Sequence, residues 1–474
     1  MAPISKLVEL AARGLDTKST FAPPFQSSSF TLDSSGVAGF FGGDGAVQAM
    51  ATVHLFEGRR WFGWYNTPGS YEIAKQYGQL ANSRLWDGLF PGPNRDPAQL
   101  FGLDGRAGPP FLAAHSGSYI QRSGHLAHLI ACKVQSKSVE TYVPSRRRPG
   151  VSDCTVAIID FRGEGPPLEM TPPRRKSRLP LIALVPISAS VAACVLCALV
   201  ADWWCFVSIA YGILASGIAC FVIGSAELTF RHPAPAKGAP PGDGVLLDEG
   251  SGGVIVLRGK EGAVNALTRG RYYLNFDFED PPDLEGAGGE PRYARIGACS
   301  VLLTIQFLLQ LLFIPQGTLF GQILFVVTLG VSWSYNAYLS ALEKEGIQTE
   351  ILLDVLNLRE RVDVQKLAFG TRTAMAVFTC LALRSPRPMK LLDTLLPNDT
   401  PVWKRWKEVI VHRLLNERAL RFGEEDWKLA EFGLEGQALL QDLFVDAEDA
   451  YEGWYKAACH SEAASEYKEQ GGSS

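Results

Sequence analysis

Two long stretches of the sequence contain neither lysine nor arginine. None of the 45 Lys and Arg residues falls between Arg178 and Arg231, or between Arg295 and Lys344, which leaves gaps of 52 and 48 residues. A helix of about 20 apolar residues crosses a bilayer, because the hydrocarbon core is about 30 Å thick. Each stretch is therefore long enough for two membrane-spanning helices joined by a tight turn. A buried helix of a soluble protein rarely runs so far without a charge.

Turn signals divide each stretch into two halves. The first contains Ala201-Asp-Trp-Trp204, where the aspartate is costly at mid-bilayer and the paired tryptophans favour an interface. The second contains Pro315-Gln-Gly317. We therefore expect four transmembrane helices arranged as two tight hairpins, with hairpin 179–228 containing spans at about 179–200 and 205–225, and hairpin 296–340 containing spans at about 296–314 and 318–340.

The basic residues around these spans predict an orientation. The two expected turns carry no Lys or Arg, whereas the basic cluster Arg174–Arg178 precedes the first span and Lys344 follows the last. Because Lys and Arg accumulate in cytosolic loops, we expect an integral membrane protein with both termini and the central loop in the cytosol. The cluster should also attract the anionic lipids of the inner leaflet.

Composition excludes several classes of protein. The formal charge is −4, which excludes a strongly basic nucleic-acid-binding protein. Nine cysteines in 474 residues are too few for a disulfide scaffold. The expected environment is therefore the lipid bilayer, with no nucleic acid as a partner.

The remaining chain is expected to lie in the cytosol in several parts. These are a loose tail at 1–44, a mixed α/β region at 45–161, a Pro-rich basic linker at 162–178, a loop at 229–295, a helical region at 341–423 and an acidic tail at 424–474. Within 45–161 we expect strands at 46–56 and 155–161 and helices at 71–84 and 124–134.

The central loop and the C-terminal region carry clearer local signals. Strand patterns at 245–248, 254–258 and 271–276 and a short helix at 261–268 predict a small ββαβ unit that must dock on another cytosolic part. The segment 373–383 is apolar but too short to span, so a buried helix is expected. The helix beginning after Thr400 carries a Trp face, and we favour a packed domain helix over one lying on the membrane.

Small residues recur along the second span. They repeat at every fourth position and therefore lie on one helix face: Ser208, Gly212, Ser216, Cys220 and Gly224. Small residues let helices approach closely in lipid. We expect this face to pack against the first span, or to join a second copy of the chain in a homo-oligomer.

The second hairpin carries a stripe of uncharged polar residues. It consists of Gln306 and Gln310 on the third span and Thr328, Ser332 and Asn336 on the fourth. Such groups seek hydrogen-bond partners in hydrocarbon, so interhelical bonding is one interpretation and the lining of a solute path is the other. We favour packing, because ionisable groups within the spans are few and lie near their ends.

Catalytic signatures are absent from the sequence, which contains no phosphate-binding loop, nucleophile elbow or HExxH motif. The best constellation is His125-x-x-His128-x-x-x-Cys132, whose three side chains would share a helix face and suit zinc. Structural zinc normally uses clearer paired spacing, so we expect ordinary half-buried residues, no metal and no other cofactor.

Several segments resemble a group of fungal four-span integral membrane proteins that have no assigned activity. The resemblance rests on residues 238–244, 262–270, 334–340 and 395–403, and it does not extend to the first 160 residues. It implies a multi-pass membrane protein and assigns no catalytic residue.

The leading hypothesis is a multi-pass membrane protein that acts as a non-enzymatic scaffold for a cytosolic partner protein. It rests on the large share of the chain predicted on one side of the membrane. One alternative is an oligomeric channel or transporter subunit. The other is an enzyme housed in 45–161.

Overall fold

The computed structural model describes residues 39–81, 84–93, 95–146, 153–161, 165–248, 252–276, 293–356 and 365–471. The chain divides into two compact units. Unit 1 comprises the described residues of Met1–Gly105, Thr171–Thr229 and Tyr272–Ile347, and unit 2 those of Arg106–Met170, Phe230–Arg271 and Gln348–Ser474. Most of the expected tail at 1–44 lies outside the described residues.

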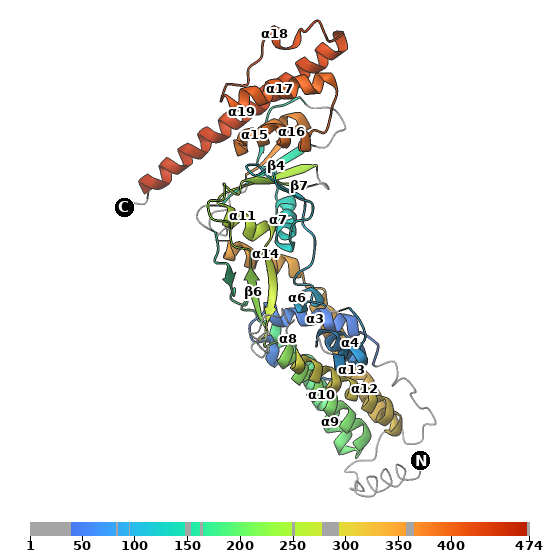
Figure 1. The fold of residues 1–474 in the computed structure, drawn as a ribbon. Helices are drawn as coiled ribbons and strands as arrows, with labels where there is room; N and C mark the ends of the chain where they lie inside the picture. The colour runs from blue at the N-terminus through green and yellow to red at the C-terminus, as the bar shows by residue number, and fades with distance from the viewer. Residues whose placement is uncertain are drawn as a thin grey trace. The chain divides into compact units, whose positions relative to one another are not determined.

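Four apolar helices of membrane-spanning length form the body of unit 1. They are α9 (Leu184–Leu199, preceded by α8, Leu179–Ile182), α10 (Trp203–Ile223), α12 (Ala294–Phe313) and α13 (Leu319–Ser340). Figure 1 shows them running side by side. The four helices expected from the sequence are thus confirmed, with boundaries within a few residues of the expected ones. The turn at Pro315 is the short 3₁₀ helix η2 (Ile314–Gln316).

Two further helices of unit 1 come from the region expected to be cytosolic. α3 (Gly43–Leu55) packs against α13, and α4 (Ser70–Leu80) packs along α12. The strand expected at 46–56 is wrong, because this run is rich in alanine and nearly all of it is buried as a helix. Short helices complete the unit: η1 (Arg59–Trp61), α5 (Arg84–Leu89) and α6 (Pro97–Leu100).

Unit 2 is built on a seven-stranded mixed sheet of order β2-β1-β7-β8-β4-β10-β3. Its strands are β1 (Phe111–Ala113), β2 (Tyr119–Ile120), β3 (Thr141–Tyr142), β4 (Cys154–Asp160), β7 (Gly244–Asp248), β8 (Gly253–Arg258) and β10 (Gln365–Phe369). β4 lies parallel to β8 and antiparallel to β10. Its buried residues, Val156 to Ile159, are apolar throughout, as expected for a strand covered on both faces.

The four elements of the expected ββαβ unit are present as β7, β8, α11 (Glu261–Thr268) and β9 (Arg271–Asn275), but they do not form one unit. Its hairpin does dock on other strands, because β7 pairs with β1 and β8 pairs with β4. β9 belongs instead to a second sheet of order β5-β6-β9, with β5 (Glu169–Met170) and β6 (Glu227–Arg231).

Helices cover both faces of the large sheet. Leu367 and Phe369 of β10 pack in one core with α15 (Arg372–Leu383), α16 (Pro388–Leu395), α17 (Pro401–Leu415) and α19 (Leu434–Gly471). The preceding Lys366 points the other way, where its ammonium donates to the Val134 and Lys137 carbonyls at the end of α7 (His125–Ser136) at 2.9 and 2.8 Å. α7 therefore lies on the opposite face.

The C-terminal helices confirm two expectations and correct one. α15 is buried, and Trp406 of α17 is fully buried in the core, as expected of a domain helix. The expected acidic tail is instead part of the fold, since α19 places Leu440 and Phe444 in the same core. Within the expected helical region, α14 (Lys344–Val355) begins separately after α13 ends at Ser340. The remaining helix is α18 (Glu424–Trp427).

Candidate functional site

An extended segment of unit 1 inserts between the apolar helices. This inserted segment, residues 60–69, begins within η1, leads into α4 and runs along α10. The contacts descend α10 in order, from Arg60 at Gly224 through Gly63 at Cys220 and Trp64 at Gly217 to Asn66 at Gly212. Each of the three α10 glycines lacks room for a Cβ, which would approach the segment to within 2.5 Å. Because Gly212 lies near the middle of α10, the segment reaches the middle of the bundle.

Asn66 is the residue at which the four helices meet. It is fully buried, its backbone N–H donates to Ser190 Oγ on α9 at 3.1 Å, and its side chain fills the space left by Gly212 on α10. Its Oδ1 accepts from Gln310 Nε2 on α12 at 3.0 Å, and its Nδ2 donates to Thr328 Oγ1 on α13 at 3.1 Å. One side chain thus satisfies polar groups from two helices and occupies a notch in a third.

The neighbours of Asn66 extend this network. Gln306 Nε2 donates to the Thr67 carbonyl at 3.3 Å. Asn336 Nδ2 donates to Thr67 Oγ1 at 3.3 Å, and Tyr65 Oη donates to Asn336 Oδ1 at 2.8 Å. The segment then turns at Gly69, whose positive φ of 70° and absent Cβ permit contact with the start of α3.

These contacts give the residues singled out in the sequence a different partner from the expected one. The small-residue face of α10 receives the inserted segment at Gly212, Cys220 and Gly224, while α9 and α10 pack through other residues, including Cys197 and Ile209. The small residues permit close approach as expected, but to extended backbone. Ser208 and Ser216 are also buried on α10.

The polar stripe also bonds to the segment more than to other helices. Gln306, Gln310, Thr328 and Asn336 all contact residues 65–67, whereas Ser332 is buried with no hydrogen-bond partner in the described part of the chain. Asn66 and Thr67 were missed by the sequence reasoning. The available signals were the Asn-Thr-Pro-Gly turn at 66–69 and, far along the chain, the Gln306 and Gln310 amides in an apolar helix, which need hydrogen-bond partners.

Arg59 is buried beside the inserted segment, with 1% of its surface exposed. Its Nη1 donates to the Phe62 carbonyl at 3.0 Å and lies 3.8 Å from Cys220 Sγ. Its guanidinium carbon lies 5.4 Å from the centre of the Tyr335 ring. Within the described residues no carboxylate pairs with Arg59, whose neighbours include the Phe62 carbonyl, the Tyr65 hydroxyl and the Tyr335 ring.

Asp202 links the two helical hairpins at the other end of the bundle. Its carboxylate caps α10 by accepting from Cys205 N–H at 3.1 Å. It also accepts from the backbone N–H and the hydroxyl of Thr318, at 2.8 and 2.6 Å, immediately before α13. The turn expected at 201–204 is thus confirmed, and its aspartate is buried, with 3% exposed.

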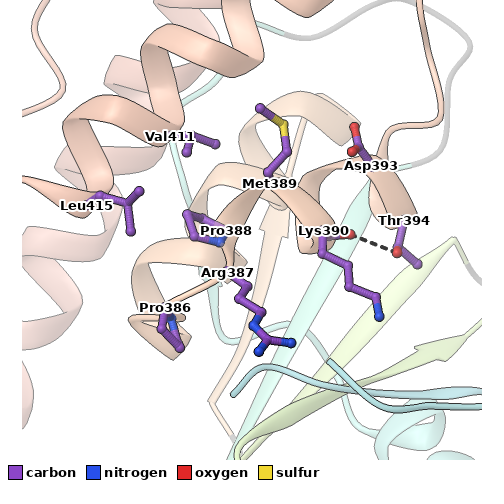
Figure 2. Close-up of a pocket in the computed structure, with 9 residues that line it drawn as sticks. All are labelled: Pro386, Arg387, Pro388, Met389, Lys390, Asp393, Thr394, Val411 and Leu415. Carbon is purple, nitrogen blue, oxygen red and sulfur yellow. Dashed lines mark hydrogen bonds between the residues drawn. The ribbon is translucent and has the colours of Figure 1, made fainter. Parts of the chain in front are cut away.

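Unit 2 has an open groove of about 590 Å³ between α16 and α17. Figure 2 shows Val411 and Leu415 of α17 facing Pro388 of α16, with Arg387 and Lys390 at the edge. Both cations bond to backbone carbonyls, Arg387 to Ser116 and Lys390 to Gly117. The groove therefore presents an apolar floor, and its charged lining residues are two cations, Arg387 and Lys390, and one carboxylate, Asp393.

The metal candidates of the sequence lie together on α7 of unit 2. His128 Nε2 is 3.6 Å from Cys132 Sγ, and the His125 ring stacks on that of His128 with centroids 6.2 Å apart. His125 is buried and Cys132 is exposed. Among the described residues of unit 2 alone, no three ligand atoms come close enough to hold an ion, so this unit by itself supplies no complete metal site.

Comparison with known proteins gives no relative for the chain. No protein-family model matches it, and no curated protein or solved structure matches it. The resemblance to the fungal four-span group therefore stays a prediction, and function must be inferred from the geometry above.

Proposed function

We propose that this protein is a multi-pass membrane protein whose unit 1 anchors the chain in a bilayer and whose unit 2 acts as a cytosolic scaffold for a partner protein. The proposal is supported by four apolar helices of sufficient length that expose rows of large side chains, including Leu181, Val195, Leu312 and Val327. Such an apolar surface is rare on soluble proteins and normal against lipid. The inserted segment then becomes a re-entrant loop, which membranes tolerate only where it is buried in protein.

The proposed orientation places both termini in the cytosol. Arg175, Lys176 and Arg178 are exposed immediately before the first span, where they would contact anionic lipids of the inner leaflet. A glycosylation or protease reporter inserted at Trp203 tests this orientation. We expect it to be accessible only from the non-cytosolic side, and accessibility only from the cytosol contradicts the proposal.

A scaffold is favoured over a solute path by the closure of the bundle. The polar stripe that would line a path is bonded to Asn66 and Thr67, and the cavity beside it measures only about 20 Å³. Reconstituted vesicles should therefore show no ion or solute flux above that of empty vesicles. A flux that Gln310→Leu and Asn336→Leu abolish would establish the channel or transporter alternative instead.

The groove between α16 and α17 offers a test of the scaffold itself. Leu415, 55% exposed, lies in the groove, whereas Leu434 is 87% exposed and lies outside it. We expect Leu415→Asp to remove a specific set of partners detected by proximity labelling from the C-terminus, and the matched control Leu434→Asp to keep them. Equal labelling by wild type and both variants would refute the binding of a partner in this groove.

A further inference from the structure

A small cavity lies beside Arg59 in unit 1. Its volume is about 20 Å³, and α3, α4, α10, α12 and α13 all contribute to its wall together with the inserted segment. Its polar lining consists of Arg59, Tyr65, Thr67, Tyr77, Ser216 and Asn336. A space of this size holds one water molecule or one monatomic ion and is too small for a phosphate or a carboxylic acid.

The lining is rich in hydrogen-bond donors and carries a positive charge. Arg59 is the one ionised group in it, and the cavity wall contains no Asp or Glu. Two donors, Arg59 Nε and Tyr77 Oη, are buried without a hydrogen-bond partner in the described part of the chain. Both side chains are at least 99% buried, so bulk water does not solvate them. A buried cation is stable only when it is paired and its hydrogen bonds are satisfied.

We propose that this cavity binds one halide-class anion, for which chloride is the abundant example. The anion accepts from Arg59 Nε–H and Tyr77 Oη–H and neutralises the guanidinium. A single water could accept from both donors but would leave the charge uncompensated. The inference does not depend on the scaffold or on the orientation of the chain, because it concerns the packing of unit 1 alone.

The test measures thermal unfolding of the full chain in detergent at constant ionic strength. When chloride replaces gluconate from 1 to 100 mM, we expect Tm to rise saturably by about 2 to 5 °C. Bromide should substitute for chloride, and sulfate should not. Protein exchanged into gluconate should release about one chloride per chain on denaturation if the resident ion exchanges slowly.

Two variants and a control assign the effect to the cavity. Tyr77→Phe removes only the hydroxyl and should raise the chloride concentration at half-effect about tenfold or more. Arg59→Met should abolish the chloride dependence. Arg60→Met is the control, because the Arg60 guanidinium lies over the Trp61 and Phe221 rings outside the cavity, and it should respond to chloride as wild type does.

Three results would overturn the proposal. The first is a wild-type Tm that is independent of chloride together with no chloride released on denaturation, which indicates a water molecule only. The second is an unchanged chloride response in Tyr77→Phe. The third is loss of the response in Arg60→Met to the same extent as in Arg59→Met.

Discussion

Replacing Asn66 with alanine should loosen the four-helix bundle of unit 1. The change removes the acceptor of Gln310 Nε2 and the donor to Thr328 Oγ1. Thr328 keeps its bond to the Phe325 carbonyl at 2.7 Å, so the main loss falls on the Gln310 amide, which is 2% exposed. An unsatisfied buried amide costs about 1 to 3 kcal/mol, and the space left by the side chain adds to this.

We therefore expect Asn66→Ala to lower the free energy of unfolding by about 2 to 4 kcal/mol, measured by denaturant titration of the full chain in detergent. The control is Gln316→Ala, which deletes an exposed amide in η2 and should change stability by less than about 0.5 kcal/mol. A double-mutant cycle with Gln310→Leu should give a coupling energy of about 1 kcal/mol. A stability of Asn66→Ala equal to that of the control would refute the central role of this residue.

Three other substitutions have defined outcomes. Gly212→Ala places a Cβ 2.2 Å from Asn66 Oδ1 and should lower Tm by several degrees. Gly330→Ala, with nothing within 4 Å, should leave Tm unchanged or raise it. Equal effects of the two variants would contradict the close contact between Asn66 and Gly212. Asp202→Ala removes the helix cap and the link between hairpins and should cost about 2 to 4 kcal/mol in the same denaturant titration, and a neutral effect would contradict the link. Burial raises the pKa of Asp446 from 3.8 to about 6, despite the nearby Arg146. Because the folded state binds this proton more tightly, about 3 kcal/mol of stability present below pH 4 is lost as the pH rises through 6. Asp446→Asn should flatten the dependence of the free energy of unfolding on pH over that range. An unchanged dependence would show that Asp446 is not the group responsible.

The apolar helices could be predicted because the evidence for them is compositional. Two stretches without Lys or Arg and two turn signals were sufficient to locate all four helices. The hairpin of β7 and β8 and the buried helix α15 were equally readable, since each depends on a local pattern. The sheet order of unit 2 was not, because its strands come from segments more than 200 residues apart.

The inserted segment could not be predicted from the same signals. The alanine-rich run of α3 is short and fits a strand or a helix equally well. Because α3 was not predicted as a helix, the location of the inserted segment that follows it could not be predicted either. The small residues of α10 correctly indicated a close contact, but their spacing does not say whether a helix or an extended chain occupies the groove. In α19 the signal was present, since Leu440, Leu443 and Phe444 share a face, but the many acidic residues outweighed it.

The most direct test of the account is whether the inserted segment lies against α10. A Cβ at Gly63 would lie 2.2 Å from Cβ and 2.7 Å from Sγ of the native Cys220. Gly63→Cys therefore places the two thiols in contact once the backbones separate by about 1 to 2 Å, to the Cβ separation of a disulfide. Oxidation of the full chain in membranes should then yield a disulfide between residues 63 and 220, detected by peptide mass. The same treatment of Gly58→Cys, where nothing lies within 4 Å, should give none. A Gly63→Cys thiol that stays unlinked and reacts with a water-soluble maleimide would contradict the account.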